Sequence, residues 1–192
     1  MRLLAPAIAV ITLAACGPSN DPTDGKSSTA ASSQTSSQET ESAFSHEDIM
    51  FAQAMIPHHQ QAIDMSNLAL KNSQSARVQG LAQRIKSAQT TEIATLRKWI
   101  DDSGMGDSHA GDHGSMSGML SKEEMSALAA AQGPAFDKLF LKGMIKHHEG
   151  AIDMAAAVTE SENREVSDFA NWMRSTQYNE ITEMTVVFSQ IP

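Results

Sequence analysis

The sequence has one cysteine, few aromatic residues and no apolar run long enough to span a bilayer. Cys16 is the only cysteine among the 192 residues, so no intramolecular disulfide can form. Aromatic residues make up 5% of the chain and hydrophobic residues 41%, which favours a helical bundle over a β-sandwich. The longest apolar run, Leu3 to Ala15, is interrupted by Pro6 and is shorter than the roughly 20 residues that cross a bilayer. A transmembrane bundle is therefore excluded.

Basic residues are also scarce. The chain has 14 Lys and Arg residues against 23 Asp and Glu residues, which gives a net charge of −9. Because binding to nucleic-acid phosphates needs a clustered basic surface, we expect no nucleic-acid partner. No glycine-rich phosphate loop, Ser/His/Asp arrangement or nucleophilic cysteine motif stands out either, and we expect that the protein is not an enzyme.

The N-terminal 44 residues are predicted to target and tether the protein. Residues 1–15 have the character of a signal peptide, and Leu13-Ala-Ala-Cys16 resembles the lipobox of bacterial lipoproteins. A lipidated Cys16 followed by the polar linker 16–44 would anchor a periplasmic lipoprotein, with contact to the membrane only through the lipid. Gly17 is compatible with outer-membrane sorting in a cell with two membranes. The alternative is an ordinary secretory signal with an incidental cysteine.

Residues 45–192 are expected to form one all-α domain, an antiparallel four-helix bundle. Ser45 can cap a first helix that runs to about Leu70, with a kink at Pro57. A second helix should begin after Ser75 and end between Asp101 and Gly104. A loop over 104–120 then joins the two halves of the domain.

The second half is expected to begin with a capping box. Ser121 and Glu124 form this box, and the helix is interrupted at Gly133-Pro134 before it continues to about Val158. Ser161 is the predicted cap of the last helix.

An internal repeat indicates that the bundle is built from two duplicated helical hairpins, about 46–103 and 134–190. The segment Phe51 to Met65 matches Phe140 to Met154, 89 residues further along the chain. The apolar positions of this repeat are expected to be core. Both copies also contain the motif Met-x-x-His-His, and chance rarely repeats such a pattern.

The repeated methionines and histidines fall on one face of each helix, at about 100° per residue. Asp64 and Asp153 fall on the opposite face, so a structural or solvent-facing role is expected for them. Glu92 and Glu180 occupy seam positions between apolar neighbours, where a buried carboxylate needs a partner. Each is predicted either to receive the N–H of a metal-bound imidazole or to bind metal directly. The predicted metal ligands are Met55, His58, His59, Met65, Met144, His147, His148 and Met154.

The loop over 104–120 contains a second group of candidate ligands. Methionine has no packing role in a polar, glycine-rich segment, so its presence there favours metal binding, although incidental residues remain an alternative. His46, near the start of the first helix, is expected to be exposed. The loop candidates are Met105, His109, His113, Met116 and Met119.

The ligand types predict the metal. Thioether sulfur is a poor ligand for hard cations and a good one for Cu(I), while imidazole accepts Cu(I), Cu(II) and Zn(II). Combined methionine and histidine therefore point to copper, as Cu(I), Cu(II) or both.

These motifs resemble the bacterial family called domain of unknown function 305. The resemblance covers about Ser45 to Ser189 and is most specific at Met55-Ile-Pro-His-His59 and at Met144 through Met154. It implies a ferritin-like four-helix bundle and copper handling like that of CopM-type periplasmic copper-binding proteins, which are associated with copper resistance. It extends to the eight helical Met and His candidates above. The second copy departs from the first at Lys146, which stands in place of Pro57.

Three functions are therefore weighed. The leading one is a cell-envelope copper-binding protein that serves copper sequestration, tolerance or delivery without catalytic turnover. The first alternative is a ferritin-like dimetal oxidase that uses Glu92, Glu180 and the histidines, although neither repeat has the Glu-x-x-His pair of such enzymes. The second alternative is a metal-free interaction module held at the membrane by its lipid.

Overall fold

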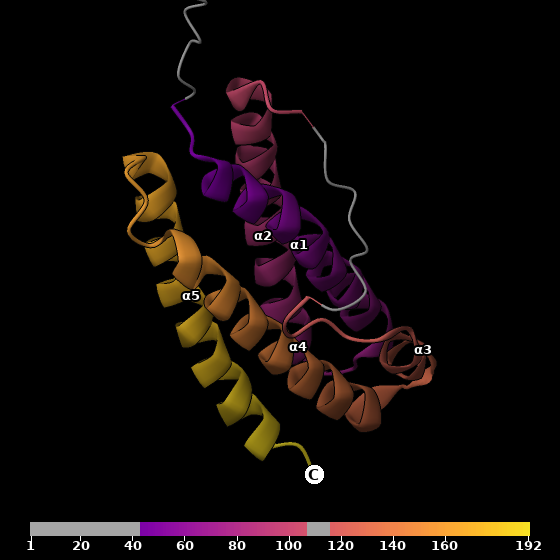
Figure 1. Ribbon diagram of the computed structural model, residues 1–192. Coiled ribbons are helices and arrows are strands. Elements are labelled where there is room, and N and C mark those ends of the chain that lie inside the picture. Colours follow the sequence, from indigo (N-terminus) through magenta and orange to yellow (C-terminus); the bar gives the residue numbers. More distant parts are fainter. Residues whose placement is uncertain (1–42, 107–115) are drawn as a thin grey trace, which may run out of the picture. The chain divides into compact units, whose positions relative to one another are not determined.

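The computed structural model describes residues 43–106 and 116–192, and these residues form helices and connecting segments without a β-strand. The all-α prediction is confirmed. No helix in this part of the chain combines the length and the apolar character needed to cross a membrane. The elements are α1 (His46–Asn72), α2 (Ala76–Ser103), α3 (Lys122–Ala130), α4 (Gly133–Ala155), the 3₁₀ turn η2 (Ala156–Val158) and α5 (Arg164–Ser189) (Figure 1).

Two helices begin at the caps that the sequence predicts, and both caps are capping boxes, of which only the one at Ser121 was predicted as a box. The Ser45 hydroxyl accepts a hydrogen bond from the backbone N–H of Asp48 at 3.1 Å, and the Asp48 carboxylate accepts one from Ser45 N–H at 2.9 Å. Ser121 and Glu124 repeat this exchange at 3.1 and 2.7 Å at the start of α3. Helix α1 then continues through Pro57 to Asn72, two residues beyond its predicted end.

The interruption at Gly133-Pro134 is confirmed. Gly133 adopts a φ of +57°, a left-handed conformation that favours glycine, and Pro134 lies in the first turn of α4. Helix α4 ends at Ala155 and the chain continues through η2 to Val158, which is the predicted limit of this segment.

The predicted cap of α5 is wrong. Asn163 is the N-cap, and its side-chain oxygen accepts hydrogen bonds from the N–H groups of Glu165 at 2.9 Å and Val166 at 3.3 Å. Ser161 lies in the preceding turn, where its hydroxyl accepts from Asn163 N–H at 3.1 Å. Both residue types cap well, so the sequence alone did not separate them.

This correction gives a direct test. Asn163→Ala should lower the free energy of unfolding by about 1 kcal/mol, because two N–H groups of the first turn lose their acceptor. Ser161→Ala serves as the control and should cost less than half as much, since it removes one bond in a turn. Urea unfolding followed by circular dichroism measures both free energies of unfolding. Equal losses in the two variants would contradict the assignment of Asn163 as the cap.

The four long helices form two hairpins, α1 with α2 and α4 with α5, and α1 packs across α4. Two apolar clusters hold them. One contains Met65 from α1 with Phe140 and Met144 from α4, and the other contains Met55 from α1 with Ala151 from α4. Because increasing residue numbers on α1 meet decreasing numbers on α4, these two helices run antiparallel. The stretch of each helix between the two clusters carries the repeated histidine pair.

Candidate functional site

All four repeated histidines are buried where α1 packs against α4. His58, His59, His147 and His148 each have 0% exposed surface. The rings of His58 and His147 are in contact, with centroids 3.8 Å apart and planes inclined by 40°. His59 and His148 flank this pair, with ring centroids 6.5 Å from His58 and 6.4 Å from His147 respectively. The duplicated motif therefore forms one cluster of four imidazoles across the helix interface.

The Nε2 atoms of the central pair contact backbone carbonyls. His58 Nε2 lies 3.0 Å from the carbonyl oxygen of Ser117, and His147 Nε2 lies 2.9 Å from the carbonyl oxygen of His58. Because a carbonyl oxygen only accepts hydrogen bonds, each Nε2 carries the proton and donates it. In a neutral ring this assignment leaves the lone pair on Nδ1.

Each outer histidine lies against the seam glutamate of its own hairpin, and of these Glu92 is buried as predicted whereas Glu180 is only half-buried. His148 Nε2 lies 2.7 Å from Glu180 Oε2 within a hydrogen bond. His59 Nε2 lies 2.6 Å from Glu92 Oε2, but the contact is off the direction of a hydrogen bond. The two glutamates that the seam pattern singles out thus have imidazole neighbours, and their role toward a metal stays a prediction.

The four Nδ1 atoms of the cluster are buried and have no hydrogen-bond partner. A buried polar atom without a partner costs about 1–3 kcal/mol. Four such atoms, contributed by the same motif in two repeats, call for an explanation beyond packing. Nitrogen lone pairs in this setting are suited to bind a metal ion.

Burial keeps the central imidazoles neutral at pH 7. Removal from water lowers the pKa of His58 from 6.5 to about 4, although the hydrogen bond to the Ser117 carbonyl opposes this shift. Burial likewise holds the pKa of His147 well below 6.5, and the neighbouring histidines lower it further. The neutral ring is the form that binds metals.

The predicted methionine ligands lie in or beside the apolar clusters. Met55, Met65 and Met144 are completely buried within the clusters, and Met154 is half-buried and packs against the cluster of Met55. This environment accounts for them as core residues, and a ligand role stays a prediction. Within residues 43–106 and 116–192, no three or more His, Cys, Asp or Glu side chains are grouped as an ion would require.

The remaining polar candidates lie away from the cluster. Asp64 and Asp153 are exposed, and Asp64 accepts a hydrogen bond from Gln60 at 3.1 Å. His46 is exposed as well.

Only part of the predicted loop site falls in the described part of the chain. Met105 is 36% exposed, whereas Met116 and Met119 are half-buried. His109 and His113 lie outside the described residues, so metal binding by the loop stays a prediction.

The end of this loop, residues 116–120, forms a strap across the histidine cluster that sequence reasoning missed. The Gln61 side chain donates to Leu120 O at 2.9 Å and accepts from Leu120 N–H at 2.8 Å. Gly150 contacts the strap so closely that an added Cβ would lie 2.0 Å from Ser117 O. The strap thereby holds the Ser117 carbonyl on His58.

One sequence signal pointed to the strap. Gln61 and Gly150 occupy equivalent positions in the two repeats, and this is one of the six positions among the 15 aligned at which the two copies differ. One strap crosses both helices. It is hydrogen-bonded to the Gln61 side chain on α1, and it packs against the backbone of α4 at Gly150, where there is no side chain. It also makes the histidine pairs unequal, since His58 contacts the strap and His147 contacts α1.

Comparison with known structures yields several similar proteins. A DUF305 fragment from Deinococcus radiodurans is 28% identical with a TM-score of 0.71, over 76% of this chain and 97% of that chain. A DUF305 protein from Streptomyces coelicolor, named as a candidate secreted protein, is 26% identical with a TM-score of 0.71, over 75% of this chain and 91% of that chain. CopM in its Cu(I)-bound form is 30% identical with a TM-score of 0.64, over 74% of this chain and 95% of that chain.

CopM has also been solved in Cu(II)-bound and silver-bound forms. No curated protein matches the chain. The family model of the domain of unknown function DUF305 matches residues 48–188, which include all of the repeated motif. This match extends over most of the sequence, and the chain belongs to the DUF305 family.

Proposed function

We propose that this protein binds copper through the histidine cluster between α1 and α4 and serves copper sequestration, tolerance or delivery in the cell envelope. The observation that carries the proposal is the set of four buried Nδ1 atoms without hydrogen-bond partners. Copper binding gives these nitrogens the partner that the protein itself does not provide.

The chemistry of the cluster suits copper. Neutral imidazole accepts both Cu(I) and Cu(II), and burial keeps His58 and His147 neutral. Their Nε2 atoms are occupied by carbonyl oxygens, so Nδ1 is the ring nitrogen left for an ion. The thioethers of Met55, Met65, Met144 and Met154 are the soft donors that would favour Cu(I).

The glutamates have a supporting role in this proposal. A carboxylate that accepts the second N–H of a ligating imidazole fixes the ring and makes it a stronger donor. Glu92 and Glu180 lie 2.6 and 2.7 Å from the Nε2 atoms of His59 and His148. Glu180 accepts a hydrogen bond from its histidine and Glu92 lies against its own without one, and this pairing favours the supporting role over the carboxylate bridges of a dimetal oxidase. We accordingly propose binding without turnover.

The relatives support the metal and the compartment. CopM, solved with Cu(I), Cu(II) and silver, is similar to this chain over 95% of its length in the Cu(I)-bound form. The Streptomyces relative is named as a candidate secreted protein, which agrees with a location outside the cytoplasm. Anchoring through a lipidated Cys16 and the linker 16–44 completes the proposal of an envelope protein.

The direct test is a Cu(I) titration against a competing chelator. Replacement of His58, His59, His147 and His148 with alanine should weaken binding more than about 100-fold, because it removes the donors themselves rather than their hydrogen-bond partners. The matched control replaces the other three histidines, His46, His109 and His113, with alanine and should keep the affinity of the helical site.

Circular dichroism checks that each variant remains folded. Glu92→Gln and Glu180→Gln provide a second route that leaves all four rings in place, with an expected loss of about 10-fold to 100-fold. Unchanged stoichiometry and affinity in the histidine and glutamate variants would refute the proposal. Full loss of binding in the three-histidine control would move the site to the loop.

A further inference from the structure

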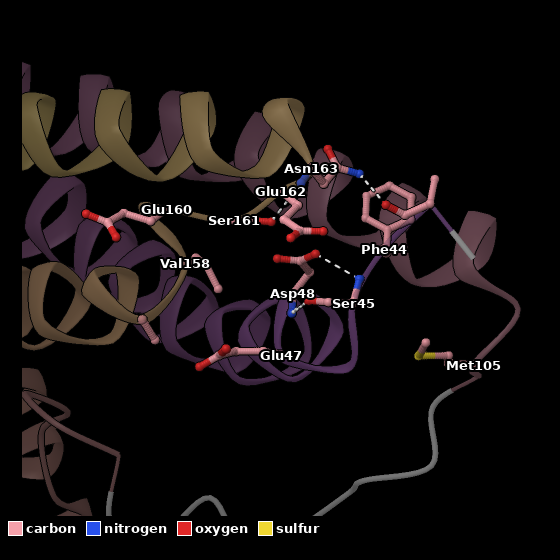
Figure 2. A pocket seen from close by; sticks show the side chains of 12 residues that line it. Phe44, Ser45, Glu47, Asp48, Met105, Val158, Glu160, Ser161, Glu162 and Asn163 are labelled. Atoms are coloured by element: carbon pink, nitrogen blue, oxygen red, sulfur yellow. Dashed lines mark hydrogen bonds between the residues drawn. The ribbon is translucent and has the colours of Figure 1, made fainter. Parts of the chain in front are cut away.

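A cavity lined by acidic residues lies away from the histidine cluster, between the start of α1 and the turn that precedes α5. It has a volume of about 620 Å³, and Figure 2 shows the side chains that line it. The two walls are already linked by a hydrogen bond from the Asn163 side chain to the Ala43 carbonyl oxygen at 2.9 Å. We call this cavity the acidic pocket.

The acidic pocket collects negative charge without a matching cation. Its lining includes the carboxylates of Glu47, Asp48, Glu160 and Glu162 and contains no lysine or arginine. The N-termini of α1 and α5 also face this region, and each contributes about half a positive charge. Two helix ends therefore offset about one of the four carboxylates, and a substantial negative charge remains.

The decisive observation is one oxygen of Asp48. Asp48 is 1% exposed, and its Oδ2 accepts the hydrogen bond from Ser45 N–H that completes the capping box. Its other oxygen, Oδ1, is buried and has no hydrogen-bond partner. Helix capping accounts for the burial of Oδ2 but not for the burial of Oδ1. In Figure 2 the carboxylates of Asp48 and Glu162 point toward one another across the pocket.

We infer that the acidic pocket binds a hard divalent cation such as Ca²⁺, with Asp48 Oδ1 and the Glu162 carboxylate as its protein ligands. Ca²⁺ takes six to eight oxygen ligands and accepts water among them. No three acidic or histidine side chains in the described ranges are grouped for an ion, so water supplies the remaining ligands. This site is separate from the proposed copper function, and its cation would fasten the start of α1 to the start of α5.

The test is isothermal titration of the metal-free full chain with CaCl₂. One Ca²⁺ per chain is expected, with a dissociation constant on the order of 10⁻⁴–10⁻³ M because the protein ligands are few. Asp48→Asn keeps an oxygen that accepts from Ser45 N–H but removes the charge, and should weaken binding at least about tenfold. Glu162→Gln alters an exposed residue outside any cap and should act in the same direction.

Asp64→Asn is the matched control, because it removes a carboxylate from α1 outside the pocket. It should leave Ca²⁺ binding unchanged, and so should the four-histidine variant that loses copper, which keeps this test independent of the copper proposal. Absence of binding up to about 10 mM Ca²⁺ would overturn the inference. Equal affinity in Asp48→Asn, Glu162→Gln and the unaltered chain would overturn it as well.

Discussion

Gly150→Ala is expected to lower the free energy of unfolding by about 3 kcal/mol, the upper range for one added methyl group in a packed interior. An alanine Cβ at this position would lie 2.0 Å from the carbonyl oxygen of Ser117 and 2.7 Å from Cα of Gly118. Both atoms belong to the backbone of the strap, which must move as a unit because Gln61 holds it at Leu120. The methyl group would therefore displace the strap from α4.

Gly80→Ala is the matched control, because it makes the same substitution inside helix α2. A Cβ there would meet only the end of the Arg84 side chain at 3.9 Å. Alanine is the better helix former, so this variant should gain about 0.5–1 kcal/mol. Chemical unfolding of both variants measures the difference. A stabilised Gly150→Ala would show that the strap does not rest on α4.

Acid is expected to destabilise the protein strongly between pH 6.5 and about 4. In this window the unfolded chain protonates His58 while the folded chain, in which the pKa of His58 is about 4, does not. The unfolded state then binds more protons, so the free energy of unfolding falls as the pH falls. For His58 alone the loss approaches roughly 3 kcal/mol below pH 4. His147, whose pKa burial also lowers, adds to the loss.

Urea unfolding at a series of pH values measures this slope. The groups that face His58 are the rings of His59, His147 and His148 and the Ser117 carbonyl. The slope of the free energy of unfolding against pH reports the number of protons taken up on unfolding. His58→Gln should reduce this number by nearly one, whereas His46→Ala, at an exposed position, should leave it unchanged. An identical slope in His58→Gln would contradict the neutral, buried state of this ring.

Local sequence patterns predicted most of the fold. Ser45 was identified as a cap by its residue type at the start of a helical pattern, and Ser121 because Glu124, three residues later, completes a capping box. The repeat with its offset of 89 residues predicted two hairpins, and matching positions do meet, as the contact between His147 and the carbonyl oxygen of His58 shows. The cap of α5 was misplaced because Ser161 and Asn163 differ little in intrinsic preference, and the geometry of the turn decides between them.

The site was less accessible to sequence reasoning, because it depends on contacts between distant segments. Helical spacing placed His58 and His59 on one face but did not predict that the His58 ring contacts His147. The strap lies outside the repeat, so no symmetry argument placed Ser117 beside His58. The acidic pocket likewise forms from residues near 48 and near 162, which no local pattern connects.

The most direct test of copper binding by the histidine cluster is anomalous diffraction at the copper edge from crystals of the Cu(I)-loaded protein. We predict an anomalous peak among the four imidazoles between α1 and α4, within bonding distance of Nδ1 atoms and absent from the four-histidine variant. Copper found only at the loop over 104–120 or on the outer surface, with these Nδ1 atoms still lacking a partner, would contradict the proposal.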